Sequence, residues 1–212
     1  DKLNKSYDYF LPLSNRSYKG LWGLSKLKFE DKNASVLIDE RFFDQAKSLL
    51  SKNKKEPFPL AGINIPAKII SGDFYNFSDL GNGKYGFGVA DVSGKGIKSS
   101  LLMSKASSLY SFLSKNNFSP ANLLIQLNNE ICETISRGMF VTMLIGVYDS
   151  NTEELLLSNA GHEQPIILDK DNNFSNFTEA GPPLGIMPKV QYKEFKLSFV
   201  QSTMYIFTDG IT

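Results

Sequence analysis

One stretch of the sequence governs the interpretation of the rest: Gly86-Phe87-Gly88-Val89-Ala90-Asp91-Val92-Ser93-Gly94-Lys95-Gly96. It begins as a short apolar run bounded by glycine, which is the pattern of a buried strand. Such a strand ends where the rigid scaffold passes into an exposed loop, so the carboxylate of Asp91 is held in a defined direction. Because Gly94 and Gly96 let the backbone curl, we expect the Val92 carbonyl to face the same point as the Asp91 side chain.

Two other carboxylates occur in similar settings. Asp73 lies in Ser71-Gly72-Asp73-Phe74-Tyr75, and Asp209 lies in Tyr205-Ile206-Phe207-Thr208-Asp209-Gly210. A single Asp beside a glycine is most often a turn residue. Three of them brought together would repel one another, and a bound cation normally neutralises such a cluster. Ligands that are all oxygen atoms favour Mg²⁺ or Mn²⁺ over zinc.

Five short motifs that include these aspartates follow one another along the chain: Ser71-Gly72-Asp73-Phe74-Tyr75, Ala90-Asp91-Val92-Ser93-Gly94-Lys95-Gly96 with Leu101-Leu102-Met103, Asn159-Ala160-Gly161-His162, Leu184-Gly185, and Thr208-Asp209-Gly210. In this order and spacing they resemble the metal-dependent PPM-type serine/threonine phosphatases, and within them the bacterial SpoIIE/RsbU branch. The resemblance covers roughly residues 57–212. One motif alone would be weak evidence, whereas five in the family's order are specific.

The resemblance implies a site for two Mn²⁺ or Mg²⁺ ions. Asp91 would bridge the ions, Asp73 and the Val92 carbonyl would bind one of them, and Asp209 the other. Two such cations share a water, lower its pKa and neutralise a phosphate while the water attacks phosphorus in line, so no further catalytic side chain is needed. The family has another metal-binding Asp beyond the motif that contains Asp209, and the sequence ends before it. We therefore expect this chain to bind at most one ion tightly and to be weak or inactive by itself.

The order of the predicted elements favours an α+β fold. Residues 63–75 have an extended pattern, residues 80–84 have the composition of a hairpin turn, and the next strand covers residues 85–92. This hairpin would bring Asp73 near Asp91. The resemblance sharpens the expectation to the αββα sandwich of the PPM-type phosphatases, C-terminally truncated, in which two antiparallel β-sheets are flanked by helices and the metals lie between the sheets at one end. Further strands are predicted at residues 140–148, 154–159, 165–168, 173–178, 191–199 and 204–208.

Two helices are predicted after the hairpin, at residues 97–113 and about 120–135. The second begins with Ser119 as N-cap and Pro120 at its first position. Each helix has a stripe that we assign to the core rather than to an interface. The stripes consist of Leu101, Leu102, Lys105, Ser108, Leu109 and Phe112 in the first helix, and of Leu123, Leu124, Leu127, Ile131 and Ile135 in the second.

Residues 1–56 differ from the rest of the chain in sequence pattern. We interpret residues 1–56 as a linker or regulatory segment, with a strand near 21–29 and a helix near 35–51, and residues 57–212 as the catalytic domain without its C-terminal end. The helix has Ser35 as its N-cap and an apolar face. It either carries a signal from an upstream sensor module or packs on the domain or on a second copy in a homodimer. The sequence leaves these alternatives open.

Composition excludes some classes of function. The 212 residues carry 23 Lys+Arg against 22 Asp+Glu, a net charge of +1, so nucleic acid and anionic membrane surfaces are not expected partners. No run of about 18 apolar residues is present that would span a membrane. Cys132 is the only cysteine, so an internal disulfide is excluded, and we expect a cytoplasmic location. Because the chain begins at Asp1, we expect a longer parent protein, which is free to carry a membrane anchor.

Three functions remain open. The first is a phosphatase that acts on phosphoserine or phosphothreonine in bacterial signalling, with a phosphorylated anti-sigma-factor antagonist as one candidate substrate. The second is a catalytically inactive regulatory or binding module with the same fold, and the third is a small-molecule phosphatase. The aspartates favour the first. His162, the only histidine, lies in a turn motif of the family, and we expect a structural role for it.

Overall fold

The computed structural model describes residues 7–11, 60–65, 72–94, 96–115, 119–136, 138–171 and 173–208. These residues form ten strands and two helices. Their bounds are β1 Tyr7–Leu11, β2 Ala61–Ile65, β3 Phe74–Gly81, β4 Lys84–Val92, α3 Ile97–Leu113, α4 Pro120–Cys132, β5 Val141–Asp149, β6 Glu154–Ala160, β7 Ile166–Leu168, β8 Phe174–Asn176, β9 Phe195–Ser198 and β10 Thr203–Phe207.

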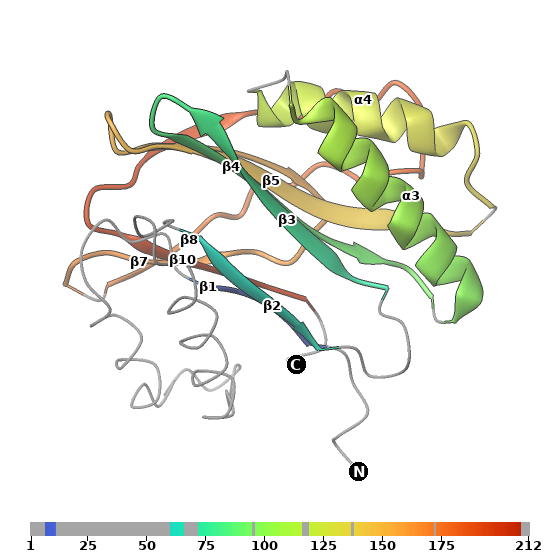
Figure 1. Cartoon of the computed structure of the whole chain (residues 1–212), viewed down its shortest axis with the longest axis horizontal. Helices are drawn as coiled ribbons and strands as arrows, with labels where there is room; N and C mark the ends of the chain where they lie inside the picture. Colours follow the sequence, from blue (N-terminus) through green and yellow to red (C-terminus); the bar gives the residue numbers. More distant parts are fainter. Residues whose placement is uncertain are drawn as a thin grey trace, which may run out of the picture.

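The strands form two five-stranded antiparallel sheets that lie face to face (Figure 1). We call the sheet with the order β3-β4-β5-β6-β9 the helix-side sheet, because α3 and α4 cover its outer face (Figure 1). The other sheet has the order β2-β1-β10-β7-β8 and is called the second sheet. Within the described residues the layers are therefore helix, sheet, sheet.

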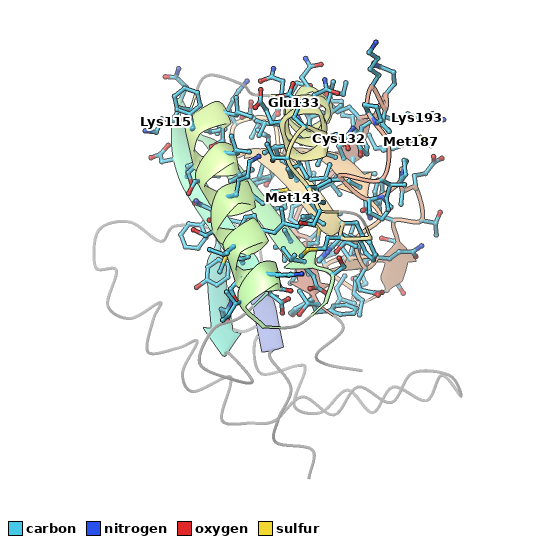
Figure 2. The ribbon with its side chains drawn as sticks, turned by 90° about the vertical axis from the view of Figure 1, so that its right-hand side faces the viewer. Lys115, Cys132, Glu133, Met143, Met187 and Lys193 are labelled. Carbon is cyan, nitrogen blue, oxygen red and sulfur yellow. The ribbon has the colours of Figure 1, made fainter. Side chains whose placement is uncertain are left out.

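Two apolar cores follow from the alternation of side chains along the strands. Phe87 and Val89 of β4 belong to the core between the sheets, together with Leu144, Leu155, Leu157, Ile167, Met204 and Ile206. Ala90 and Val92 belong to the core under the helices, where Met143 of β5 also lies (Figure 2). The side chain of Asp91 therefore projects from the same face as Phe87 and Val89, into the space between the sheets.

The β3–β4 hairpin is the part of the fold that brings the two predicted carboxylates together. Its turn contains Asn82 and Gly83 with φ values of 52° and 74°, a left-handed pair that suits the twist of a two-residue hairpin. The predicted turn is thus confirmed. The register shifts between Gly81 and Asp79, and from Asp79 opposite Tyr85 the strands pair without a further shift as far as Phe74 opposite Ala90.

The predicted extended segment at residues 63–75 is wrong in one respect. It contains the end of β2 and the start of β3, and these strands belong to different sheets. Asp73 consequently precedes the first residue of β3 instead of lying near the end of a longer strand. Asp73 still lies near Asp91, because β3 and β4 are antiparallel and the start of β3 therefore lies at the same edge as the end of β4.

Helix α3 has the predicted bounds, whereas α4 ends at Cys132, before the predicted end near Ile135, and the two helices differ in how well their buried faces were predicted. Helix α4 begins after Ser119, whose hydroxyl accepts a hydrogen bond from Asn122 N at 3.3 Å, and it buries Leu123, Leu124, Leu127 and Ile131 as expected. The predicted face of α3 is partly wrong. Leu101 is 67% exposed and Phe112 71% exposed, while the buried residues are Ser99, Leu102, Ala106 and Tyr110.

Residues 7–11 form β1, which lies between β2 and β10 in the second sheet. The expected N-terminal segment, residues 1–56, therefore contains one strand of the domain, because β1 is hydrogen-bonded to β2 and β10. The predicted strand at 21–29 and the predicted helix at 35–51 lie outside the described residues. No helix in the described ranges is both long and apolar enough to cross a membrane.

Candidate metal centre

Asp73 and Asp91 are neighbours across the β3–β4 hairpin. Phe74 pairs with Ala90, so the next position in the same register places Asp73 opposite Asp91. Counted in steps of two from Tyr75 and Val89, both side chains belong to the face between the sheets. Asp73 is only 5% exposed and Asp91 is half-buried. The structure thus brings together two of the three predicted carboxylates.

Thr208, the residue that follows β10 of the second sheet, contacts Asp73. Its hydroxyl donates a hydrogen bond to Asp73 Oδ2 at 3.1 Å, and both residues are buried. Asn64 of β2 donates its side-chain amide to the backbone carbonyl of Asp73 at 2.9 Å. Asp73 is therefore held by groups from the second sheet on both its side chain and its backbone.

The loop after β4 is fixed to its surroundings by backbone and side-chain hydrogen bonds. Ser93 exchanges them with Phe140, because Ser93 N donates to Phe140 O at 3.0 Å and Phe140 N donates to Ser93 Oγ at 2.7 Å. Ser99 Oγ of α3 donates to Ser93 O at 3.2 Å. A side chain at Gly72 would place its Cβ 3.4 Å from the Val92 carbonyl oxygen. That oxygen therefore lies beside the residue that precedes Asp73.

His162 lies next to this group on the loop after β6. Its Nδ1 is 3.1 Å from Thr142 Oγ1, and Thr142 is the register partner of Asp91 in the β4–β5 pair. Asn159 fixes the backbone of His162 twice, accepting from its N at 2.8 Å and donating to its O at 3.1 Å. Burial lowers the pKa of His162 to about 4, and a weaker interaction with the backbone of Phe207 opposes the shift. The imidazole is therefore neutral at neutral pH.

Asp209 lies outside the described residues, as do Lys95 and the residues after Asp209. Among the residues that the structure does describe, no group of three or more His, Cys, Asp or Glu side chains converges as a metal site would require. The described donors at this edge are two carboxylates and one backbone carbonyl. Oxygen donors of this kind fit a hard divalent cation such as Mg²⁺ or Mn²⁺.

Sequence reasoning missed three polar residues that surround the carboxylates: Asn64, Thr142 and Thr208. The sequence pattern alone could have pointed to one of them. Thr142 is a polar residue in an otherwise apolar strand, Val141-Thr142-Met143-Leu144-Ile145, and such an exception often marks a functional face. The contacts of Asn64 and Thr208 join the two sheets, so they depend on a packing that no local pattern specifies.

The fold defines a class of protein. Solved structures that share it include the RsbU and RsbW domains of Rv1364c from Mycobacterium tuberculosis, with 18% identity, a TM-score of 0.60, and coverage of 67% of this chain and 40% of that chain. The PP2C phosphatase domain of SpoIIE from Bacillus subtilis has 16% identity and a TM-score of 0.59, with 68% and 42% covered. RsbX in complex with magnesium has 16% identity and a TM-score of 0.58, with 68% and 69% covered. The predicted α+β fold of the PPM/PP2C-type phosphatases is confirmed.

The particular family follows from the sequence. The family model described as Stage II sporulation protein E (SpoIIE) matches residues 81–212, and the chain belongs to this family. It is 31% identical over 161 residues to phosphoserine phosphatase RsbU of Bacillus subtilis, which covers 75% of this chain and 48% of RsbU. It is 23% identical over 148 residues to phosphoserine phosphatase RsbP of the same organism, with 67% and 36% covered. The chain thus spans about half the length of RsbU and about a third of RsbP.

Proposed function

We propose that the chain is the catalytic part of a metal-dependent protein phosphatase that hydrolyses phosphoserine or phosphothreonine. One observation carries the proposal: Asp73 and Asp91 face each other in register between the sheets, and Thr208, the residue before Asp209, donates a hydrogen bond to Asp73. Two carboxylates and the residue that precedes Asp209 therefore lie at one edge. The names of RsbU and RsbP as phosphoserine phosphatases support the same reaction.

In this proposal Asp73, Asp91, the Val92 carbonyl and Asp209 would hold two Mg²⁺ or Mn²⁺ ions. When bound, such ions supply a water of lowered pKa and neutralise the charge of the phosphate. The chain's own contribution is to orient the ligands. Thr208 and Asn64 hold Asp73, and the bonds between Ser93, Phe140 and Ser99 hold the loop that follows the Val92 carbonyl.

The decisive experiment is hydrolysis of p-nitrophenyl phosphate and of a phosphoserine peptide by the full-length gene product with Mn²⁺ or Mg²⁺. We expect activity that EDTA abolishes and that Asp91→Asn lowers by about 100-fold or more, the upper end of what loss of a metal-orienting group costs. Asp149→Asn is the matched control, since Asp149 is a carboxylate at the far end of the neighbouring strand. Absence of hydrolysis with either ion would favour the inactive-module alternative, and activity on small phosphomonoesters alone would favour the small-molecule phosphatase.

Metal stoichiometry tests the count of ions. Calorimetric titration of the 212-residue chain with Mn²⁺ should give one tight equivalent, because Asp73, Asp91 and the Val92 carbonyl would serve one ion and Asp209 is the one further ligand proposed for the other. Two tight equivalents would contradict that expectation.

The partner and the assembly are part of the same proposal. The substrate is a phosphorylated protein, with an anti-sigma-factor antagonist as the candidate to test first by release of phosphate from the purified phosphoprotein. The segment 35–51 is proposed to make a homodimer or to receive a signal, and a cytoplasmic location is proposed with it. Light scattering of the unaltered chain and of Phe43→Glu, a substitution on the expected apolar face of the helix predicted there that leaves β1 in place, would decide the dimer.

A further inference from the structure

A chain of hydrogen bonds leads from the buried ring of His162 to the main chain of Asp91. Thr142 lies opposite Asp91 in the β4–β5 register and shares its face, between the sheets. Thr142 Oγ1 is 3.3 Å from the backbone oxygen of Asp91 and 3.1 Å from Nδ1 of His162. A single residue, Thr142, therefore lies between the ring of His162 and the main chain of Asp91.

The same ring interacts with the second sheet. His162 is 4% exposed, and the backbone of Phe207, the last residue of β10, contributes to its environment. Phe207 precedes Asp209 by two residues in the sequence. The imidazole consequently lies between the strand that ends at Asp91 and the strand that leads to Asp209.

We propose that His162 is a positioning residue, which, through Thr142, fixes the main chain that carries Asp91 and so holds this carboxylate opposite Asp73 at the metal centre. This inference rests on the proposed function and deepens it. It assigns to His162 a role in metal binding without making it a ligand.

Histidine suits this role because a neutral imidazole can accept a hydrogen bond at one nitrogen while it donates from the other. The Thr142 hydroxyl has one proton, and the shorter of its two contacts is to Nδ1. Because Thr142 donates this proton to the backbone oxygen of Asp91, the link requires a proton on Nδ1 of His162, which donates to Thr142 Oγ1. In the described part of the chain, Nε2 is fully buried without a hydrogen bond of standard geometry.

Asn159 holds the turn that carries the ring of His162. The side chain of Asn159 spans the turn and bonds to both the N and the O of His162. The backbone that carries the imidazole is thus held on both sides, which limits the directions that the ring can take.

The test measures Mn²⁺ and Mg²⁺ affinity by calorimetry for the chain and for three variants, Thr142→Val, His162→Gln and the double variant. We expect Thr142→Val and His162→Gln each to weaken binding by about 10- to 100-fold, the range found when partners of metal ligands are removed. The double variant should bind about as weakly as the weaker single variant, because both changes break the same link. Thr142→Val preserves shape, so it keeps the test valid if His162→Gln does not fold.

Ser158→Ala is the matched control. Ser158 is a buried residue of β6 whose hydroxyl donates to Lys193 O at 2.7 Å, so its loss removes a comparable buried hydrogen bond away from the carboxylates. A role in stability alone would lower the melting temperature in EDTA for all variants and leave metal affinity unchanged. The proposal requires weakened affinity in the Thr142 and His162 variants and unchanged affinity in Ser158→Ala.

The outcomes separate the two levels of inference. If the unaltered chain binds no divalent ion, the proposed function fails and this inference fails with it. If the chain binds the ion and Asp91→Asn abolishes binding, while Thr142→Val and His162→Gln bind as well as the unaltered chain, only the role of His162 is overturned. Labelling with ¹⁵N-histidine gives a second readout on the single imidazole, and a proton on Nε2 at neutral pH would also overturn the proposed link.

Discussion

The two ends of the β3–β4 hairpin carry the same kinds of residue in opposite settings. At the turn end, Asp79 Oδ1 accepts from Gly81 N at 2.8 Å, and Asp149 of β5 lies 3.7 Å from Lys84 Nζ; both of these bonded pairs lie towards the solvent. At the other end, Asp73 is 5% exposed and lies opposite Asp91 in register, with a threonine hydroxyl on its Oδ2.

The difference teaches how to distinguish a functional carboxylate from a structural one in this fold. A carboxylate at the turn end caps a backbone amide or pairs with lysine near solvent, so its charge costs little. At the site end a carboxylate is buried beside another carboxylate, an arrangement that disfavours both charges unless a cation joins them. Substitutions at the site end should therefore change metal-dependent properties, and substitutions at the turn end should change stability alone.

The largest expected effect is that of Asp73→Asn. We expect it to lower metal-dependent hydrolysis by about 100-fold or more, because it removes a predicted ligand charge. It should also remove the rise in melting temperature that Mn²⁺ gives the unaltered chain, since an ion that binds the folded state stabilises it. Asp79→Asn, at the other end of the same strand, should leave both properties unchanged. Equal losses in the two variants would remove the distinction between the ends.

The second effect concerns pH and the site end. Burial lowers the pKa of His162 to about 4, below the ordinary value of about 6.5. In the unfolded chain the imidazole takes up a proton as the pH falls below about 6.5, whereas in the folded chain it does not until about pH 4. Stability contributed by the neutral ring is therefore complete above about pH 6.5, falls between about pH 6.5 and 4, and levels off below.

The expected fall is about 3 kcal/mol in the free energy of unfolding, from roughly 1.36 kcal/mol for each unit of pKa. Denaturant titrations in metal-free buffer between pH 7 and pH 4 measure it. His162→Gln shares every other titratable group and should lack this part of the pH dependence, because the chain has one histidine. Parallel curves for the two proteins would refute the prediction.

The parts of the fold that were predictable from sequence have local causes. The β3–β4 turn follows from Asn82-Gly83, and the start of α4 follows from Ser119-Pro120. The buried face of α4 was also predicted, because its large apolar residues recur at helical spacing.

Helix α3 shows where that reasoning fails. Its packing is set by Tyr110, which covers Gly88 so closely that a Cβ there would lie 2.9 Å from the ring. Small residues such as Ala106 are buried as a result, while Leu101 and Phe112 face outward. Burial of large apolar residues is a tendency that does not exclude exposed ones, so the stripe alone could not identify the face.

In the candidate site, too, only the features with local causes were predictable from the sequence. Proximity of Asp73 and Asp91 follows from a hairpin, and the hairpin follows from its turn. The contacts of Thr208 with Asp73 and of His162 with Thr142 join segments far apart in sequence. They depend on how the sheets pack and on how β1 enters the second sheet, and a linear pattern carries no information on either.

A smaller effect is expected at the turn end from Gly83→Ala. Gly83 has φ +74°, and an added Cβ would lie 2.7 Å from both Asn151 Nδ2 and Ser150 Oγ. We expect a loss of about 1–2 kcal/mol in the free energy of unfolding from the left-handed backbone alone, with a steric increment on top. Gly81→Ala is the control, because Gly81 has φ +79° with no atom within 4 Å of the added Cβ. Chemical denaturation should rank Gly83→Ala below Gly81→Ala in stability, with Mn²⁺ affinity unchanged in both.

The smallest effect is expected from Asp149→Asn. The side chains of Lys84 and Asp149 are 45% and 21% exposed, so their ion pair is screened by solvent and contributes about 0.2–1 kcal/mol. Desolvation acts to raise the pKa of Asp149, but the Asn151 amide and Lys84 outweigh it and the pKa is lowered. The charge of Asp149 therefore contributes stability above the ordinary value of about 3.9, and this contribution is lost as the pH falls through the lower folded value. Denaturation of Asp149→Asn at pH 7 should show a loss that shrinks in 1 M salt, where the Debye length is about 3 Å. A loss of several kcal/mol, or one that salt does not reduce, would mean that the turn end bears a strongly coupled charge like the site end.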